Sequence, residues 1–126
     1  MERLRQNRIV CLPADRDLSR RGIPVTFFGL PTRMPPGPAR LAAVTGAQLL
    51  IVENTFTDGG WGLRFHTPIT VHGREDVPVA TQRMADAFAA DIAARPADWH
   101  MMQKLWLEDL SQERKASLTG GASESR

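Results

Sequence analysis

The segment FFGLPTRMPPGPARLAAVTG, residues 27–46, joins the end of a strand, a rigid loop and the start of a helix. Two phenylalanines before Gly29 favour a buried strand that ends at this glycine. The Pro-rich stretch 30–36 predicts a loop. Gly37-Pro38 then predicts a helix start, because proline at the first helical position lacks an N–H that would have no partner there. Gly46 is a natural C-terminal stop for that helix.

Strands are predicted on both sides of this helix. Short apolar runs rich in β-branched and aromatic residues favour strands at residues 8–12, 25–29, 48–56 and 63–65, the last with an extension towards residue 71. A helix between strands favours a layered α/β arrangement over an all-β one. We therefore expect an α/β fold with a layered mixed sheet and flanking helices. The abrupt opening also leads us to expect that this fold continues from a part further upstream.

Two more helices are predicted in the second half of the chain. Pro78 opens one that runs to about residue 94, with Phe88 and Ile92 facing the core. Pro96 ends it, and Asp98 stands at the start of another, where an acid favours the helix dipole. The side chains that share one side of this last helix are expected to be Trp99, Met102 and Trp106.

The composition fits one domain or a piece of one. Of the 126 residues, 42% are apolar, which is enough for a core. No apolar run approaches the roughly 18 residues of a membrane span, and the charged N-terminus has no signal-peptide core.

The single cysteine, Cys11, forms no internal disulfide, so a reducing cytosol is expected. Residues 111–126 have no apolar period and predict a disordered tail after a domain portion of residues 1–110.

Charge is unevenly distributed along the chain. Residues 1–40 hold eight arginines against three acids, a net +5, and residues 41–126 carry a net −3. The basic part could face phosphates or an anionic membrane surface, or be an ordinary solvated surface. Nucleic acid is disfavoured as a partner, because there is no Lys-rich run, no tyrosine and no aromatic residue interleaved with the arginines.

Two aspartates follow the first predicted strand. Asp15 and Asp17 flank Arg16, at a point where ligands of open α/β sheets collect. A carboxylate there could orient a histidine, act as a base or bind a hydroxyl group. The alternative is a loop of ion pairs with the arginines at positions 20 and 21.

A basic loop and a glycine-flanked tryptophan are further candidates. Arg33 stands just before a predicted helix N-terminus, which suits a phosphate or carboxylate, although a rigid connector explains it equally well. Trp61 lies between glycines and could line a binding groove or cover the edge of the core. His100, in the first predicted turn of its helix, would stay neutral and able to donate or accept a hydrogen bond, although a lone histidine is also a common surface residue.

The chain has no zinc-type Cys/His spacing, P-loop, nucleophile elbow or dinucleotide fingerprint, and Cys11 lies in a predicted apolar strand.

In their order and spacing along the chain, these segments resemble the bacterial lipid A biosynthesis-type acyltransferases, and most closely their actinobacterial phosphatidylinositol mannoside branch. The resemblance covers about residues 3–110 and would make the chain the C-terminal portion of an acyltransferase fold. The matching motifs are Ala14-Asp15-Arg16-Asp17-Leu18, Phe27-Phe28-Gly29, Arg33-Met34-Pro35, Gly37-Pro38-Ala39, Leu41-Ala42, Thr45-Gly46-Ala47, Gly60-Trp61-Gly62 and Asp98-Trp99-His100-Met101, with Leu110 closing.

The resemblance implies transfer of a fatty acyl chain from acyl-CoA to a sugar hydroxyl of an anionic membrane glycolipid. Acyl-CoA would be a co-substrate, and no cofactor or metal is implied. The resemblance also implies a peripheral enzyme at the cytoplasmic face of the plasma membrane.

The family's catalytic centre is a His-x4-Asp motif supported by a third acid. Asp15 matches that acid, and Trp99-His100 matches a late Trp-His pair in the same polar site, while Arg16 and Arg33 would meet phosphate groups. The chain departs from the family in two ways. The residues five positions after each of its three histidines are apolar, so His-x4-Asp is absent, and Asp15 stands where close relatives usually carry glutamate.

The absence of the base predicts very little activity for this chain alone, with the motif supplied by a missing N-terminal half. A non-catalytic lipid- or CoA-binding module and a gene remnant that never folds stably are the alternatives.

Overall fold

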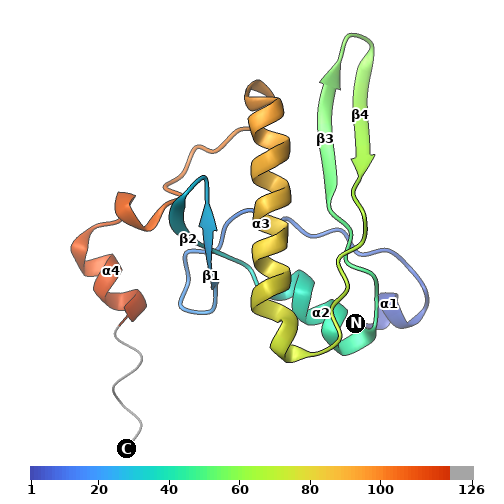
Figure 1. Ribbon diagram of the computed structural model, residues 1–126, viewed down its shortest axis with the longest axis horizontal. Helices are drawn as coiled ribbons and strands as arrows, with labels where there is room; N and C mark the ends of the chain where they lie inside the picture. The colour runs from blue at the N-terminus through green and yellow to red at the C-terminus, as the bar shows by residue number, and fades with distance from the viewer. Residues whose placement is uncertain (120–126) are drawn as a thin grey trace, which may run out of the picture.

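The structure, a computed structural model, describes residues 1–119. Its helices and strands follow one another in the order shown in Figure 1. Short 3₁₀ turns occur at Arg74–Asp76, Pro96–Asp98 and Leu107–Asp109. The main elements are α1 (Glu2–Arg5), β1 (Ile23–Phe27), β2 (Leu30–Met34), α2 (Gly37–Thr45), β3 (Val52–Thr57), β4 (Gly60–Phe65), α3 (Val77–Ala94) and α4 (Gln112–Thr119).

The long helix α3 stands between two β-hairpins (Figure 1). β1 pairs with β2 and β3 pairs with β4, both antiparallel, so the strands form two separate two-stranded sheets. The α/β class with flanking helices is confirmed. The strands do not combine into one mixed sheet within residues 1–119, because neither hairpin has a further strand beside it there.

The first hairpin turns at Phe28-Gly29. Both residues have positive φ, 51° and 78°, as a two-residue turn of type I′ requires. The stretch after Gly29 was predicted as a loop, but Leu30–Met34 forms β2, with Thr32 and Met34 buried on one face. Proline is tolerated in this hairpin because both of its strands are edges.

The helices α2 and α3 follow the sequence signals. Pro38 lies in the first turn of α2, and the left-handed Gly46 closes it with an N–H···O bond of 2.9 Å to the Ala42 carbonyl. Pro78 lies in the first turn of α3, which ends at Ala94 before the predicted breaker Pro96. Within residues 1–119, no helix has the length and apolar character needed to cross a membrane.

Two predicted elements are wrong. Residues 8–12 have no regular secondary structure and no strand partner in the described chain, and Ile9 is 89% exposed. The segment after Asp98 is not a helix, so its tryptophans do not share a helix face. Two hydrogen bonds between side chains and the backbone hold it to the first hairpin instead: the Thr32 hydroxyl donates to the Leu105 carbonyl, and the Trp106 indole donates to the Phe27 carbonyl at 3.0 Å.

The end of the chain also differs from the prediction. A helix, α4, covers Gln112–Thr119, where a disordered tail was expected. Side chains from the loop after residue 13 reach this region, since Arg20 Nε donates to the Ser117 carbonyl at 2.6 Å. Residues 120–126 lie outside the described part of the chain.

The core consists of two apolar clusters on different sides of α3. One gathers around Ala39, Ile51 and Met84. The other gathers around Phe27, Met34, Ala85 and Leu105 and closes the first hairpin and the segment 99–106 against α3. Ile23 and Phe88 pack against both, so they join the two clusters.

Candidate functional site

An open cleft of about 250 Å³ lies beside β3 and the C-terminal half of α3. Three segments that are far apart in the sequence meet there: the loop after residue 12, the strand β3, and α3 with the turn that follows it. The lining residues are Asp15, Val52, Glu53, Asn54, Thr55, Phe88, Asp91, Ile92, Arg95, Asp98 and Trp99.

Carboxylates dominate the polar lining of the cleft. Four acids from these segments line it, and Arg95 is the one cation among the lining residues of the described chain; the acids are Asp15, Glu53, Asp91 and Asp98. Carboxylates accept hydrogen bonds and repel phosphate groups. The cleft therefore suits a ligand rich in hydroxyl groups better than an anion.

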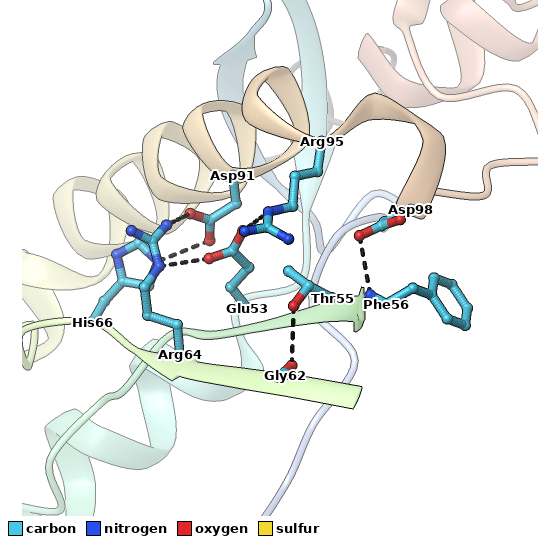
Figure 2. Close-up of polar contacts among 9 residues, drawn as sticks. All are labelled: Glu53, Thr55, Phe56, Gly62, Arg64, His66, Asp91, Arg95 and Asp98. Atoms are coloured by element: carbon cyan, nitrogen blue, oxygen red, sulfur yellow. Dashed lines mark hydrogen bonds and ion pairs between the residues drawn. The ribbon is translucent and has the colours of Figure 1, made fainter. Parts of the chain in front are cut away.

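Two of these acids hold the second hairpin to α3 (Figure 2). Arg64 on β4 lies between them, with its Nε 2.5 Å from a Glu53 carboxylate oxygen and its Nη2 2.6 Å from Asp91 Oδ1. His66 Nε2 lies 2.8 Å from the other Asp91 oxygen, and Arg95 Nε lies 3.9 Å from the second Glu53 oxygen. Every carboxylate oxygen of the pair thus has a nitrogen partner.

The ion-pair network perturbs one guanidinium. The hydrogen bond and charge of Glu53 raise the pKa of Arg64 above its ordinary value, and Asp91 adds to the same direction. The Arg64 side chain is 62% exposed, whereas Glu53 and Asp91 are each only 9% exposed. The two buried acids are therefore neutralised from the solvent side.

Residues Glu53, His66 and Asp91 are also the residue types that bind metal ions. Their candidate ligand atoms lie within 4.8 Å of one another. Arg64 already holds one oxygen of each carboxylate, and His66 and Arg95 face the other two, so a divalent cation would compete with these contacts. The geometry favours an ion-pair network that positions β3 along the cleft.

Asp98 fixes the far end of β3. Its Oδ2 accepts a hydrogen bond of 3.2 Å from the Phe56 backbone N–H (Figure 2). Trp99, the next residue, packs edge-on against Phe27 with ring centroids 6.2 Å apart. Its indole N–H is buried and has no hydrogen-bond partner among residues 1–119. The turn after α3 thus brings an acid and an aromatic ring to the same wall.

The structure brings two of the predicted site residues together. Asp15 and Trp99, which are far apart in the sequence, both line the cleft. His100 follows Trp99 directly, but its side chain is exposed and it is not among the lining residues. The shared site therefore contains the predicted carboxylate and the tryptophan of the Trp-His pair.

The predicted basic residues lie elsewhere. Arg16 Nε donates to the Lys104 carbonyl at 2.7 Å, and Arg33 Nη1 donates to the Gly22 and Arg20 carbonyls at 3.0 and 3.3 Å. These arginines hold loops together, and neither lines the cleft. Arg33 belongs to β2 and does not stand at the helix N-terminus, because the predicted loop is mostly strand.

Trp61 also lies away from the cleft lining. It stands at the tip of the second hairpin, 71% exposed, with its ring centroid 4.5 Å from that of Phe56. Within residues 1–119 it neither covers the core nor lines the cleft beside β3.

Comparison with known proteins gives the family. The model of the family described as bacterial lipid A biosynthesis acyltransferase matches residues 1–108. The chain belongs to this acyltransferase family. Over 117 residues it is 55% identical to a protein of Mycobacterium tuberculosis and 53% identical to one of Mycolicibacterium smegmatis, both named phosphatidylinositol mannoside acyltransferase.

The matches cover 93% of this chain but only 37–38% of the length of these relatives. The recognition of an acyltransferase of this branch from the sequence motifs is thereby confirmed. The chain spans well under half of the curated relatives that it matches.

Three acids of the cleft were not predicted as site residues from the sequence, although the sequence pattern around two of them, Asp91 and Glu53, could have indicated them. Asp91 lies between Phe88 and Ile92 on the core-facing side of α3, where an acid needs a partner. Glu53 lies directly across from Arg64 once the two-residue turn after Thr57 fixes the register. Asp98 was predicted as a helix start and matched as part of the Asp98-Trp99-His100-Met101 motif, but no role in a site was predicted for it; in the structure its carboxylate accepts a hydrogen bond from the Phe56 backbone N–H.

Proposed function

We propose that this chain carries the acceptor-binding part of an acyltransferase that acts on a sugar hydroxyl of a phosphatidylinositol mannoside-type glycolipid. The observation that carries the proposal is the acidic cleft in which Asp15 and Trp99 meet. The relatives' names supply the acceptor class. Acyl-CoA is the proposed donor, and the proposed place of action is the cytoplasmic face of the plasma membrane.

The cleft suits the sugar rather than the phosphate of such an acceptor. Sugar hydroxyls donate hydrogen bonds to carboxylates such as Asp15 and Asp98, and the Trp99 ring offers an apolar wall for the C–H face of a pyranose. The glycolipid phosphate would lie outside this acidic region. His100, exposed at the next position, would contact the acceptor from the rim.

The acyl transfer step needs a base that removes the proton of the attacking hydroxyl. The hydroxyl oxygen would attack the thioester carbonyl, the ester would form, and the CoA thiol would leave with a proton. Positioned bases contribute about 10²–10⁴-fold in rate, and this chain lacks the His-x4-Asp motif. We propose that Asp15 positions a base supplied by the part of the fold that this chain does not contain, so the chain alone turns over very little acyl-CoA.

The test combines this chain with the unmatched N-terminal part of the Mycobacterium tuberculosis relative. The two are co-expressed, and transfer of a labelled acyl group from acyl-CoA to phosphatidylinositol mannoside is measured. We expect transfer by the combination, little by either part, at least a tenfold loss with Asp15→Asn, and no loss with Asp86→Asn on the exposed side of α3. Turnover by this chain alone, lost on His100→Ala, would show that no second part is needed.

A non-catalytic binding module is the second candidate, and the missing His-x4-Asp motif favours it. It predicts that the chain binds the glycolipid or acyl-CoA, yet no acyl transfer occurs even with the N-terminal part present. Binding measured by calorimetry alongside the transfer assay separates the two candidates.

A further inference from the structure

The second hairpin has two faces of opposite chemistry. Residues that pair across β3 and β4 lie on the same side of the sheet, so each pair belongs to one face. One face carries Glu53 with Arg64 and turns towards α3, where Asp91 completes the network (Figure 2). The other face carries the pairs Val52–Phe65, Asn54–Leu63 and Phe56–Trp61.

The apolar face is the one left open. The side chains of Phe56, Trp61, Leu63 and Phe65 are 57%, 71%, 63% and 63% exposed. Usually one face of an antiparallel sheet packs on the core and the polar face meets water. Here the polar face packs on α3 and the apolar one is open, in a hairpin that projects beyond the rest of the chain (Figure 1). Contiguous exposed apolar side chains of this kind mark an interaction surface.

A second open apolar segment lies near the base of this hairpin. Asp15 shares the cleft with Val52, and the segment just before it holds Ile9, Val10 and Leu12 at 89%, 37% and 44% exposure. The composition of residues 8–12 favours a strand, yet no strand of the described chain pairs with it. A partner that supplied a strand edge would satisfy this segment as well.

We propose that the apolar hairpin face and residues 8–12 form the docking surface for a polypeptide with the N-terminal part of the acyltransferase fold. This inference rests on the proposed function for the identity of the partner. It is carried by the share of the relatives that this chain spans, 37%, and by the two apolar surfaces that the described chain leaves open. In the complex, residues 8–12 become a strand and the hairpin side chains are buried.

Other occupants fit the surface less well. A hairpin that inserts into an anionic membrane needs cations beside its apolar residues. Arg64 lies on the opposite face, the apolar face carries no lysine or arginine, and the turn carries Asp58. A second copy of this chain would bring the same residues again and not the remainder of the fold.

The first experiment measures association, not catalysis. This chain is co-expressed with a tagged N-terminal part of the Mycobacterium tuberculosis relative, ending where the match begins, and co-purification is quantified by size exclusion with light scattering. The wild-type chain is expected to form a 1:1 complex, and the triple variant Trp61→Thr, Leu63→Thr, Phe65→Thr to lose at least tenfold in recovered complex. Val79→Thr, which removes an equally exposed valine on α3, is the matched control and should change nothing.

A second measurement covers the case in which the separate partner is insoluble. The N-terminal part is joined covalently to this chain, and the alkylation rate of Cys11 is followed by mass spectrometry. Cys11 is exposed in the present structure and lies within residues 8–12. We expect at least a tenfold slower reaction in the joined protein than in this chain alone.

Each contrary result overturns the proposal. Equal alkylation rates of Cys11 in the two proteins would contradict it, as would full complex formation by the triple variant. A hairpin-dependent homodimer would also contradict it. So would hairpin-dependent binding to phosphatidylcholine vesicles with 30% phosphatidylglycerol in place of the protein partner. Complex formation without acyl transfer would instead preserve the docking surface and refute the proposed activity.

Discussion

Arg64 and Asp91 join the second hairpin to the long helix, with Arg64 Nη2 2.6 Å from Asp91 Oδ1. The contact bridges two elements that otherwise meet through few apolar side chains, because the apolar face of the hairpin turns away from α3. The position of β3 along the cleft therefore depends on charge.

Asp91→Asn should destabilise the chain. The change leaves Arg64 and His66 without their shared carboxylate at a largely buried position, and we expect a loss of about 1–2 kcal/mol in the free energy of unfolding, since Arg64 can turn towards water. Urea unfolding followed by circular dichroism measures it. Asp86→Asn on the same helix is the control, and an equal effect of both changes would contradict the role of the network.

Arg64→Lys should make stability depend on pH in the alkaline range. The pKa of Arg64 is raised in the folded state, so its contribution is fully present below the ordinary arginine value and is lost only as pH rises above it. A lysine at this position has an ordinary pKa of about 10.4, so its contribution is lost as pH rises through its folded value. The difference in unfolding free energy between wild type and variant should grow from pH 8 to pH 11. A constant difference would mean that the charge of residue 64 is not what stabilises the hairpin.

The two partly buried tryptophans, Trp99 and Trp106, should respond differently to loss of the indole N–H. Trp106→Phe removes a hydrogen bond of 3.0 Å to the Phe27 carbonyl and should cost about 1 kcal/mol beyond the change in packing. Trp99→Phe removes a buried donor that has no partner in the described chain, so it should cost less. Thermal unfolding of both variants provides the comparison, and a larger loss for Trp99→Phe would be the contrary outcome.

The turn of the first hairpin holds a phenylalanine in the left-handed region. Phe28 has φ 51°, a conformation that costs a residue with a Cβ about 1 kcal/mol relative to glycine. Its ring also contacts Phe27 with centroids 4.7 Å apart. Phe28→Gly and Phe28→Ala both remove that contact, so their difference isolates the backbone. The glycine variant should unfold at the higher urea concentration, and equal midpoints would argue against strain at this turn.

Local signals predicted the parts of the fold that local physics decides. Pro38 and Gly46 mark the ends of α2 because both act within one turn of the chain. The strand predicted at residues 8–12 failed because a strand needs a partner, and none is present in the described chain. The helix predicted after Asp98 failed because Thr32 and Phe27 offer hydrogen bonds to an extended segment there.

In the candidate site too, the sequence pattern identified some residues but not the contacts that they make. Asp15 and Trp99 were found through motif resemblance, and the structure places both in one cleft. Arg16 and Arg33 were read as ligands for phosphate because spacing alone does not reveal which backbone carbonyls lie nearby. The pairing of Arg64 with Asp91 depends on how the hairpin packs on α3, which no local pattern determines.

We propose that the acidic cleft beside Asp15 and Trp99 binds the acceptor sugar, and one titration tests this binding directly. The chain has three tryptophans, so a ¹⁵N-labelled sample gives three indole N–H resonances, and Trp99→Phe identifies the one of interest. On titration with a deacylated phosphatidylinositol mannoside, the Trp99 resonance should shift in a saturable way, those of Trp61 and Trp106 should stay in place, and Asp15→Asn should weaken the apparent affinity at least tenfold. A Trp99 resonance that does not move at saturating ligand, or a shift confined to Trp61, would contradict the claim.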